Sequence, residues 1–150
     1  MMEGSLAQGI YVGNFTHRLD ARKRVTVPSS WRVTGDEGNF YFGWENPAGC
    51  IAVMPPRMLQ DLMRKAETVA QYDLKKRAML RQFFGKGYQF GVDKQGRILL
   101  AENLLRHATI SREAVLVGLG ATFEIWNPEK YAAEDAGVDI TDAMEELQFF

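Results

Sequence analysis

The chain has 150 residues, of which 46% are hydrophobic and 25% are charged, and its formal net charge at pH 7 is −1. This composition is that of an ordinary globular protein with one domain or two small halves. One cysteine rules out an intramolecular disulfide framework, and we see neither an apolar run of membrane-spanning length nor a secretion signal. We therefore expect a cytoplasmic protein with no membrane contact, metal ion or cofactor.

The first part of the chain is typical of short strands separated by turns. We expect residues 1–9, which are small and polar, to be disordered. Pro28, followed by two serines that could cap, is typical of a helix start. The expected strands are 11–19, 25–27, 39–44 and 50–54, with turns at 20–24 and 46–49 and a loop at 36–39.

Two helices are predicted next. The first opens at Pro55-Pro56, because apolar residues then recur at three- and four-residue spacing. That apolar face consists of Met58, Leu59, Leu62, Met63 and Ala66. The second helix spans 73–84 and is ended by Gly85-Lys86-Gly87.

The remaining chain repeats the order of the first part. Strands are expected at 88–92, 98–100, 115–120 and 123–126, with a short helix at 102–107 after the second strand and another helix opening at Pro128. This parallel in element order indicates two copies of one module, because a solenoid would need three or more shorter repeats.

A short motif marks the same place in both copies. Asp20-Ala-Arg-Lys-Arg24 recurs 73 residues later as Asp93-Lys-Gln-Gly-Arg97. Aspartate suits the first position of a type I turn, and Gly96 supplies the positive φ of the bulge that closes such a hairpin. We interpret Asp20, Asp93 and Gly96 as the residues that shape the turns. Each arginine then begins a strand, with its guanidinium expected to point freely outward.

Cationic side chains gather around both turns. They are Arg18, Arg22, Lys23 and Arg24 at the first turn, and Lys94 and Arg97 at the second. Guanidinium groups can hold two acceptors at once, on phosphate or on guanine, so we predict that these six residues bind double-stranded DNA. The alternative is that charged hairpins are merely solvated.

The charge is distributed unevenly along the chain. All 18 basic residues lie at or before Lys130, and six acidic residues and no basic ones follow it. A basic body with an acidic tail is typical of proteins that interact with polyanions, the tail acting as a competitor or modulator. A solvated C-terminal segment is the alternative.

The two motifs, their strands and the helices between them resemble the MraZ family from about Tyr11 to Tyr131. The resemblance implies an α+β, mainly β fold, a duplicated AbrB-like swapped-hairpin β-barrel with short helices. The modules would be 10–87 and 88–131, followed by an acidic tail at 132–150. In the first turn, Arg22 and Lys23 stand where the family has lysine and glycine.

The resemblance also implies a function. Members of that family form homo-oligomeric rings and regulate transcription by binding short direct repeats in the promoter of the division and cell-wall gene cluster. The arginine of each turn contacts DNA, which here means Arg24 and Arg97. A nucleoid-associated cytoplasmic location follows from that function.

Two other classes of function stay open. The paired hairpins could belong to an assembly module that binds a protein partner instead of DNA. An enzyme is the weaker alternative, because His17 and His107 fall in different types of element and no phosphate-binding glycine motif is present. We expect the aromatic residues and Cys50 to belong to the core or to interfaces.

Overall fold

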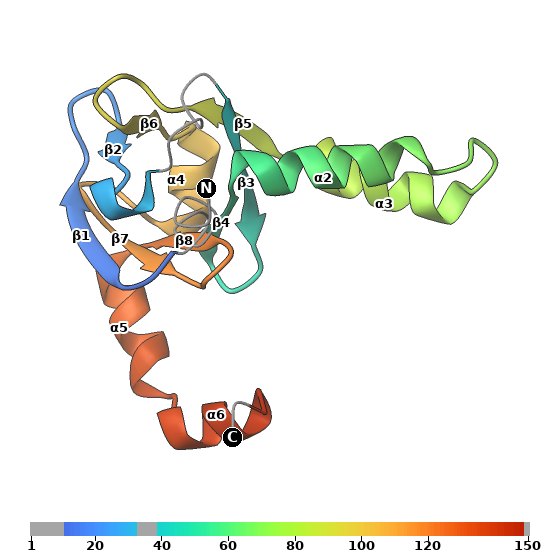
Figure 1. Cartoon of the computed structure of the whole chain (residues 1–150). Coiled ribbons are helices and arrows are strands. Elements are labelled where there is room, and N and C mark those ends of the chain that lie inside the picture. Colours follow the sequence, from blue (N-terminus) through green and yellow to red (C-terminus); the bar gives the residue numbers. More distant parts are fainter. Residues whose placement is uncertain (1–10, 33–38, 149–150) are drawn as a thin grey trace, which may run out of the picture.

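Strands form the body of the protein, in two open sheets (Figure 1). The computed structural model describes residues 11–32 and 39–148, so segment 1–9 and most of the loop expected at 36–39 lie outside the described residues. The strands are β1 (Asn14–Arg18), β2 (Arg24–Thr26), β3 (Phe40–Asn46), β4 (Cys50–Met54), β5 (Tyr88–Gly91), β6 (Arg97–Leu99), β7 (Glu113–Gly118) and β8 (Phe123–Trp126). One sheet has the order β1-β7-β8-β4-β3-β5, and the other pairs β2 with β6.

The strands on either side of each turn do not form a ladder with each other, which differs from the expected hairpins. Each turn closes with two backbone hydrogen bonds of 3.0 Å. They run from Asp20 N to Arg24 O and from Lys23 N to Asp20 O in the first turn, and from Asp93 N to Arg97 O and from Gly96 N to Asp93 O in the second. Beyond these bonds, β1 pairs with β7, β5 pairs with β3, and β2 pairs with β6, all antiparallel. The strand that precedes each turn therefore pairs with a strand of the opposite half, and the strands that follow the two turns pair with each other.

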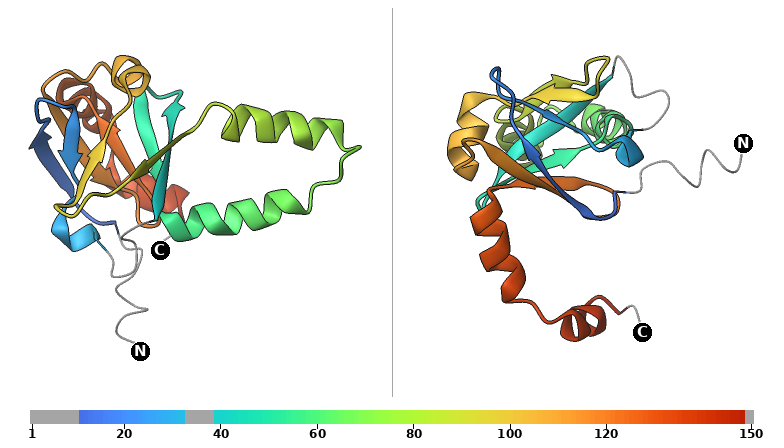
Figure 2. Two further views of the ribbon diagram at one scale, coloured as in Figure 1. Left: turned by 90° about the horizontal axis from the view of Figure 1, so that it is seen from above. Right: turned by 90° about the vertical axis from the view of Figure 1, so that its left-hand side faces the viewer.

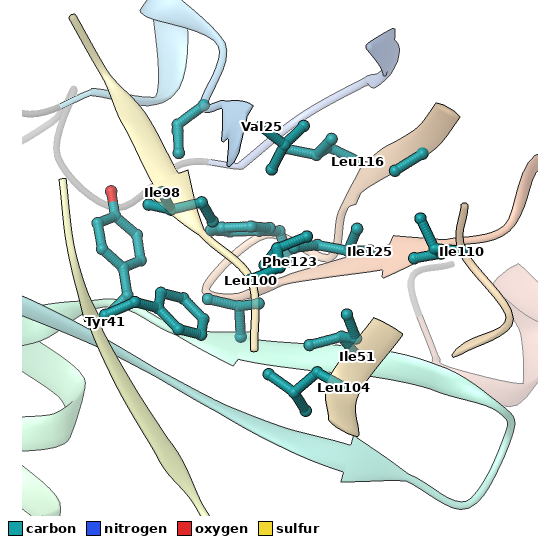
Figure 3. Close-up of a cluster of buried hydrophobic side chains, with 14 of the residues drawn as sticks. Val25, Tyr41, Ile51, Ile98, Leu100, Leu104, Ile110, Leu116, Phe123 and Ile125 are labelled. Carbon is teal, nitrogen blue, oxygen red and sulfur yellow. The ribbon is translucent and has the colours of Figure 1, made fainter. Parts of the chain in front are cut away.

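The main core lies between the two sheets (Figure 3). Val25 of β2 faces its register partner Ile98 of β6, and both are buried. Beneath them lie Ile51, Phe123 and Ile125 of the six-stranded sheet, which are fully buried. Burial of aliphatic and aromatic side chains is the main stabilising contribution to folding, so both halves depend on this shared core.

The helices connect and flank the strands. They are η1 (Ser29–Trp31), α2 (Pro56–Glu67), α3 (Leu74–Phe84), α4 (Glu102–Ala108), α5 (Pro128–Ala136) and α6 (Ile140–Glu146). The helix start expected at Pro28 is only one 3-10 turn, and no serine side chain caps it. Helix α5 is capped by Asn127 and continues across the module boundary expected after Tyr131.

Helices α2 and α3 project from the body and are separated along their length (Figure 2, left). Both occur where the sequence predicts them, and the Asp73 carboxylate caps α3 by accepting a hydrogen bond from Lys76 N at 3.1 Å. At their base, Phe42 of β3 packs against Phe83 of α3 with ring centroids 5.0 Å apart. This aromatic contact ties the projecting helices to the outer face of β3.

The fold class is α+β, as the sequence predicts. Its strands build the body, in two open sheets. No helix within 11–32 and 39–148 is both long and apolar enough to cross a membrane.

Candidate nucleic-acid interface

The two turns have the same hydrogen bonds between an aspartate side chain and backbone amides. The Oδ1 atom of Asp20 accepts from Arg22 N and Arg24 N, each at 2.9 Å. The Oδ1 atom of Asp93 likewise accepts from Gln95 N and Arg97 N at 2.9 Å. A short carboxylate that bonds to amides two and four residues ahead holds the chain in a tight turn, which explains why both copies begin with aspartate.

The fourth residue of each turn has a left-handed backbone. Gly96 has φ of 80° and Lys23 has φ of 64°. This conformation directs the Gly96 carbonyl to accept from Val27 N at 2.8 Å and the Lys23 carbonyl to accept from Leu100 N at 3.1 Å. Each turn is thereby joined to the opposite half of the chain. A side chain in this region is strained, so the first turn carries a cost of about 1 kcal/mol that glycine avoids.

Arg24 and Arg97 lie in one ion-pair cluster with the two turn aspartates, and we call these four residues the Asp–Arg cluster. Arg24 Nε donates to Asp20 Oδ2 at 2.7 Å, and Arg97 Nε donates to Asp93 Oδ2 at 2.8 Å. Each Nη1 also lies near the other turn's aspartate, at 3.9 Å for Arg24 to Asp93 and 3.8 Å for Arg97 to Asp20.

The cluster corrects the expectation that the two guanidinium groups point freely outward. Their side chains are only 26% and 29% exposed, and both are ion-paired. The reason is the pairing of β2 with β6, which brings two turns 73 residues apart in sequence to one place. The aspartates therefore shape the turns and also orient the arginines.

The turn geometry lowers the pKa of both aspartates. For Asp20 the main cause is the hydrogen bond from the Arg24 backbone amide, and the side chain of Arg24 adds to it. For Asp93 the backbone amide and side chain of Arg97 act in the same way. Both effects favour the carboxylate form, so the cluster holds two positive and two negative charges at neutral pH.

The other four cations predicted to bind DNA surround the cluster. Arg18 ends β1, Arg22 and Lys23 lie in the first turn, and Lys94 lies in the second; all four are exposed. Lys23 Nζ lies 3.5 Å from the Ser111 carbonyl. Because the cluster itself is balanced in charge, the positive character of this surface comes from these four side chains.

Comparison with known proteins decides the family. The family model of the MraZ protein matches residues 83–147. The transcriptional regulator MraZ of Desulforamulus reducens is 33% identical over 81% of this chain and 84% of its own length. The proteins of the same name from Thermomicrobium roseum and Clostridium acetobutylicum are 32% and 29% identical, over 83% and 92% of this chain and 87% and 96% of their own lengths.

The chain belongs to the MraZ family. The family model covers the second turn, and the aspartate and arginine of that turn recur in the first. The sequence analysis did not identify Arg32, whose guanidinium lies so close to Gly96 that a Cβ atom there would overlap with it. Arg32 is exposed and adds a further cation beside the second turn. Because Arg32 lies far from Gly96 in the sequence, no local pattern indicates this contact.

His107 and Cys50, which were also considered for chemistry, have structural surroundings in this chain. His107 lies with Nε2 2.6 Å from the Asn46 carbonyl and Nδ1 3.6 Å from Glu45, linking α4 to the β3–β4 turn. Cys50 is buried, which raises the pKa of its thiol to about 12. Such a thiol is not a nucleophile at neutral pH. Among the described residues, no group of three or more metal-ligating side chains occurs.

Proposed function

We propose that this MraZ chain is a sequence-specific DNA-binding regulator of transcription, and that Arg24 and Arg97 contact DNA. The observation that carries the proposal is the meeting of both turns at the Asp–Arg cluster, surrounded by exposed cations. The names of the relatives agree with it, because they are transcriptional regulators.

The ion pairs leave each arginine able to bind an outside acceptor. A guanidinium has five N–H donors, and the aspartates engage Nε at short range and Nη1 only at 3.8–3.9 Å. Holding Nε fixes the plane of the group, so less side-chain entropy is lost when it meets a base edge or a phosphate. Arg18, Arg22, Lys23 and Lys94 then supply contacts to phosphates.

The proposal includes a homo-oligomer, which for this family implies a ring. Helix α3 has 11 residues, none of them buried, and isolated helices of this length are marginally stable in water. Its Leu74 and Met79 are 76% and 59% exposed. A second copy packing on α3 would bury these side chains, and several copies would multiply weak contacts with DNA into useful avidity.

The finer features of the proposal rest on the family resemblance. They are an AbrB-like swapped-hairpin arrangement of the two halves, short direct repeats in the promoter of the division and cell-wall gene cluster as the target, and a nucleoid-associated location. The interleaving of β1 with β7 and of β5 with β3 supports the first of these. Short repeats suit an oligomer that presents the same turns at regular intervals.

The decisive experiment measures binding to a site selected from a random DNA pool, by fluorescence anisotropy across a salt series. Arg24→Ala and Arg97→Ala should each weaken binding by about 1–3 kcal/mol or more, because a base contact is lost in every subunit that touches DNA. Arg64→Ala is the matched control, since Arg64 is an exposed, ion-paired arginine on α2. Circular dichroism checks the fold of each variant.

The outcomes separate DNA binding from protein binding. A steep loss of affinity with salt, together with loss in the two turn variants but not in the Arg64 variant, supports the proposal. If both single variants and the double variant bind DNA like the unchanged protein, the turns do not read DNA. An assembly module with a protein partner then becomes the better account.

A further inference from the structure

A cavity lies beside the first turn and has no role in the function proposed above. Its volume is about 810 Å³, and it is bounded by β5, the end of β6, helix α4 and the segment Thr109–Ser111. Pockets for small molecules commonly have volumes of about 300–1,000 Å³. The cavity therefore has the size of a ligand site.

The lining combines apolar side chains with cations. Leu105 and Ile110 are each only 6% exposed and form the inner part, whereas Leu99 is 57% exposed although it is apolar. Arg22, Lys23 and Arg106 are exposed along the lining, and Glu102 is the one acidic side chain among the lining residues. A ligand with an apolar body and a negative head group matches this distribution.

The corresponding place in the other half of the chain holds an arginine side chain. Lys23 corresponds to Gly96 and Leu105 corresponds to Arg32, each 73 residues apart. In that half the Arg32 side chain lies against Gly96, which is buried. The neighbouring Trp31 is 2% exposed and packs edge-on against Phe15 at 5.4 Å. Among the described residues, an arginine side chain thus lies beside the second turn, whereas a cavity lies beside the first.

We propose that the cavity beside the first turn binds a small amphipathic anion, a carboxylate with an apolar body of roughly medium fatty-acid size. The body would cover Leu99, Leu105 and Ile110, and the carboxylate would pair with Arg106, Lys23 and Arg22. Arg106 is held in place by a hydrogen bond from its Nη2 to Asn103 Oδ1 on the same helix. Two independent features support one occupant, the exposed apolar Leu99 and the excess of positive charge around it.

The test uses the full chain without DNA and titrates it with octanoate, octanol and octylamine in a calorimeter. Octanoate should bind most tightly and octylamine least, because only the carboxylate matches the charge of the lining. Leu99→Trp places a bulky ring where the apolar body would lie and should lower octanoate affinity about tenfold or more. Arg106→Gln should weaken octanoate while leaving octanol unchanged.

Leu119→Trp is the matched control, because Leu119 is 55% exposed and does not line the cavity. Its octanoate affinity should equal that of the unchanged protein. The proposal is overturned if octanoate does not bind at millimolar concentration, if the three probes bind equally, or if Leu99→Trp binds octanoate normally. A change in oligomer mass in Leu99→Trp with unchanged octanoate binding would instead assign the surface to a second copy.

Ligand binding in this cavity would oppose DNA binding, and this consequence rests on the proposed function. A carboxylate beside Arg22 and Lys23 neutralises part of the charge offered to phosphates. Saturating octanoate should therefore reduce DNA affinity in the unchanged protein and in Leu119→Trp, but not in Leu99→Trp. Because the titrations without DNA test the cavity alone, failure of this last step leaves the cavity proposal standing and counts against the role of the first turn in DNA binding.

Discussion

At the scale of single residues, Asp20 and Asp93 both shape their turns and hold the arginine side chains. Each carboxylate bonds two backbone amides through Oδ1 and one arginine through Oδ2. The turn chemistry of Asp20 and Asp93 could be read from the sequence, because it depends on residues within four positions. The cross-pairing of Arg24 with Asp93 could not, because it depends on how β2 meets β6.

The lowered pKa of the two aspartates predicts how stability depends on pH. A carboxyl group whose folded-state pKa is below its ordinary value of 3.8 stabilises the fold above that value, and loses this contribution as pH falls through the folded-state pKa. The free energy of unfolding should therefore decline below about pH 4. An Asp20→Asn/Asp93→Asn variant should be less stable at neutral pH and show a shallower decline.

Urea unfolding at a series of pH values measures this effect, with Asp61→Asn as the control. Asp61 is an exposed acid that pairs with Arg64 on α2, outside the turns. Its variant should retain the acid decline of the unchanged protein. Equal pH profiles for the double variant and the unchanged protein would show that the turn aspartates do not contribute.

The left-handed backbone of Lys23 predicts that a substitution by glycine stabilises the protein. Lys23→Gly removes the steric cost at φ of 64°, and part of that gain is offset by greater chain entropy in the unfolded state. The net gain should be on the order of 1 kcal/mol at most. Arg22→Gly is the control, because Arg22 lacks a positive φ and its variant should be less stable. If the melting temperature of Lys23→Gly does not rise, the left-handed backbone at Lys23 does not cost the protein stability.

At the scale of elements, the sequence predicted most strands and helices but not how the strands pair. Strands β4 and β8 have the predicted bounds, because short apolar runs between turn residues specify them locally. The partners of β1 and β5 lie in the opposite halves of the chain, and no local pattern encodes that choice. Burial favours this choice, since it places Phe15 beside Leu116 and Phe90 beside Tyr41 at the shared core.

The shared core predicts a large loss of stability when a buried side chain of β6 is shortened. Ile98 is fully buried, so Ile98→Ala should lower the free energy of unfolding by about 2–5 kcal/mol. Its neighbour Leu99 is 57% exposed, so Leu99→Ala should change stability by less than about 0.5 kcal/mol. Denaturant unfolding at one protein concentration measures both, since oligomer stability depends on concentration. Similar values for the two variants would mean that β6 is not anchored as described.

At the scale of the whole molecule, two features extend from the strand body. The acidic tail, which includes α6, leaves on the opposite side from the two turns (Figures 1 and 2). In this structure the tail therefore does not cover the proposed DNA surface of its own chain, and a modulating role would act on another copy. Helices α2 and α3 project in a third direction and expose Met63, Leu74 and Met79.

The exposed apolar side chains of α3 predict that this helix holds the oligomer together. Light scattering at micromolar concentration should give a mass above that of the 17.0 kDa chain, and Leu74→Lys/Met79→Lys should lower it, because two buried cations would face an apolar partner surface. Val12→Lys/Leu119→Lys changes two equally exposed apolar residues elsewhere, at 65% and 55% exposure, and should leave the mass unchanged. Partial loss of α3 helicity in the first variant, seen as weaker circular dichroism at 222 nm, is expected to accompany dissociation. Phe83 and Phe84 hold the end of α3 on the body, but no residue of the helix is buried. A monomeric mass for the unchanged protein would contradict the oligomer, and DNA binding could then gain nothing from avidity.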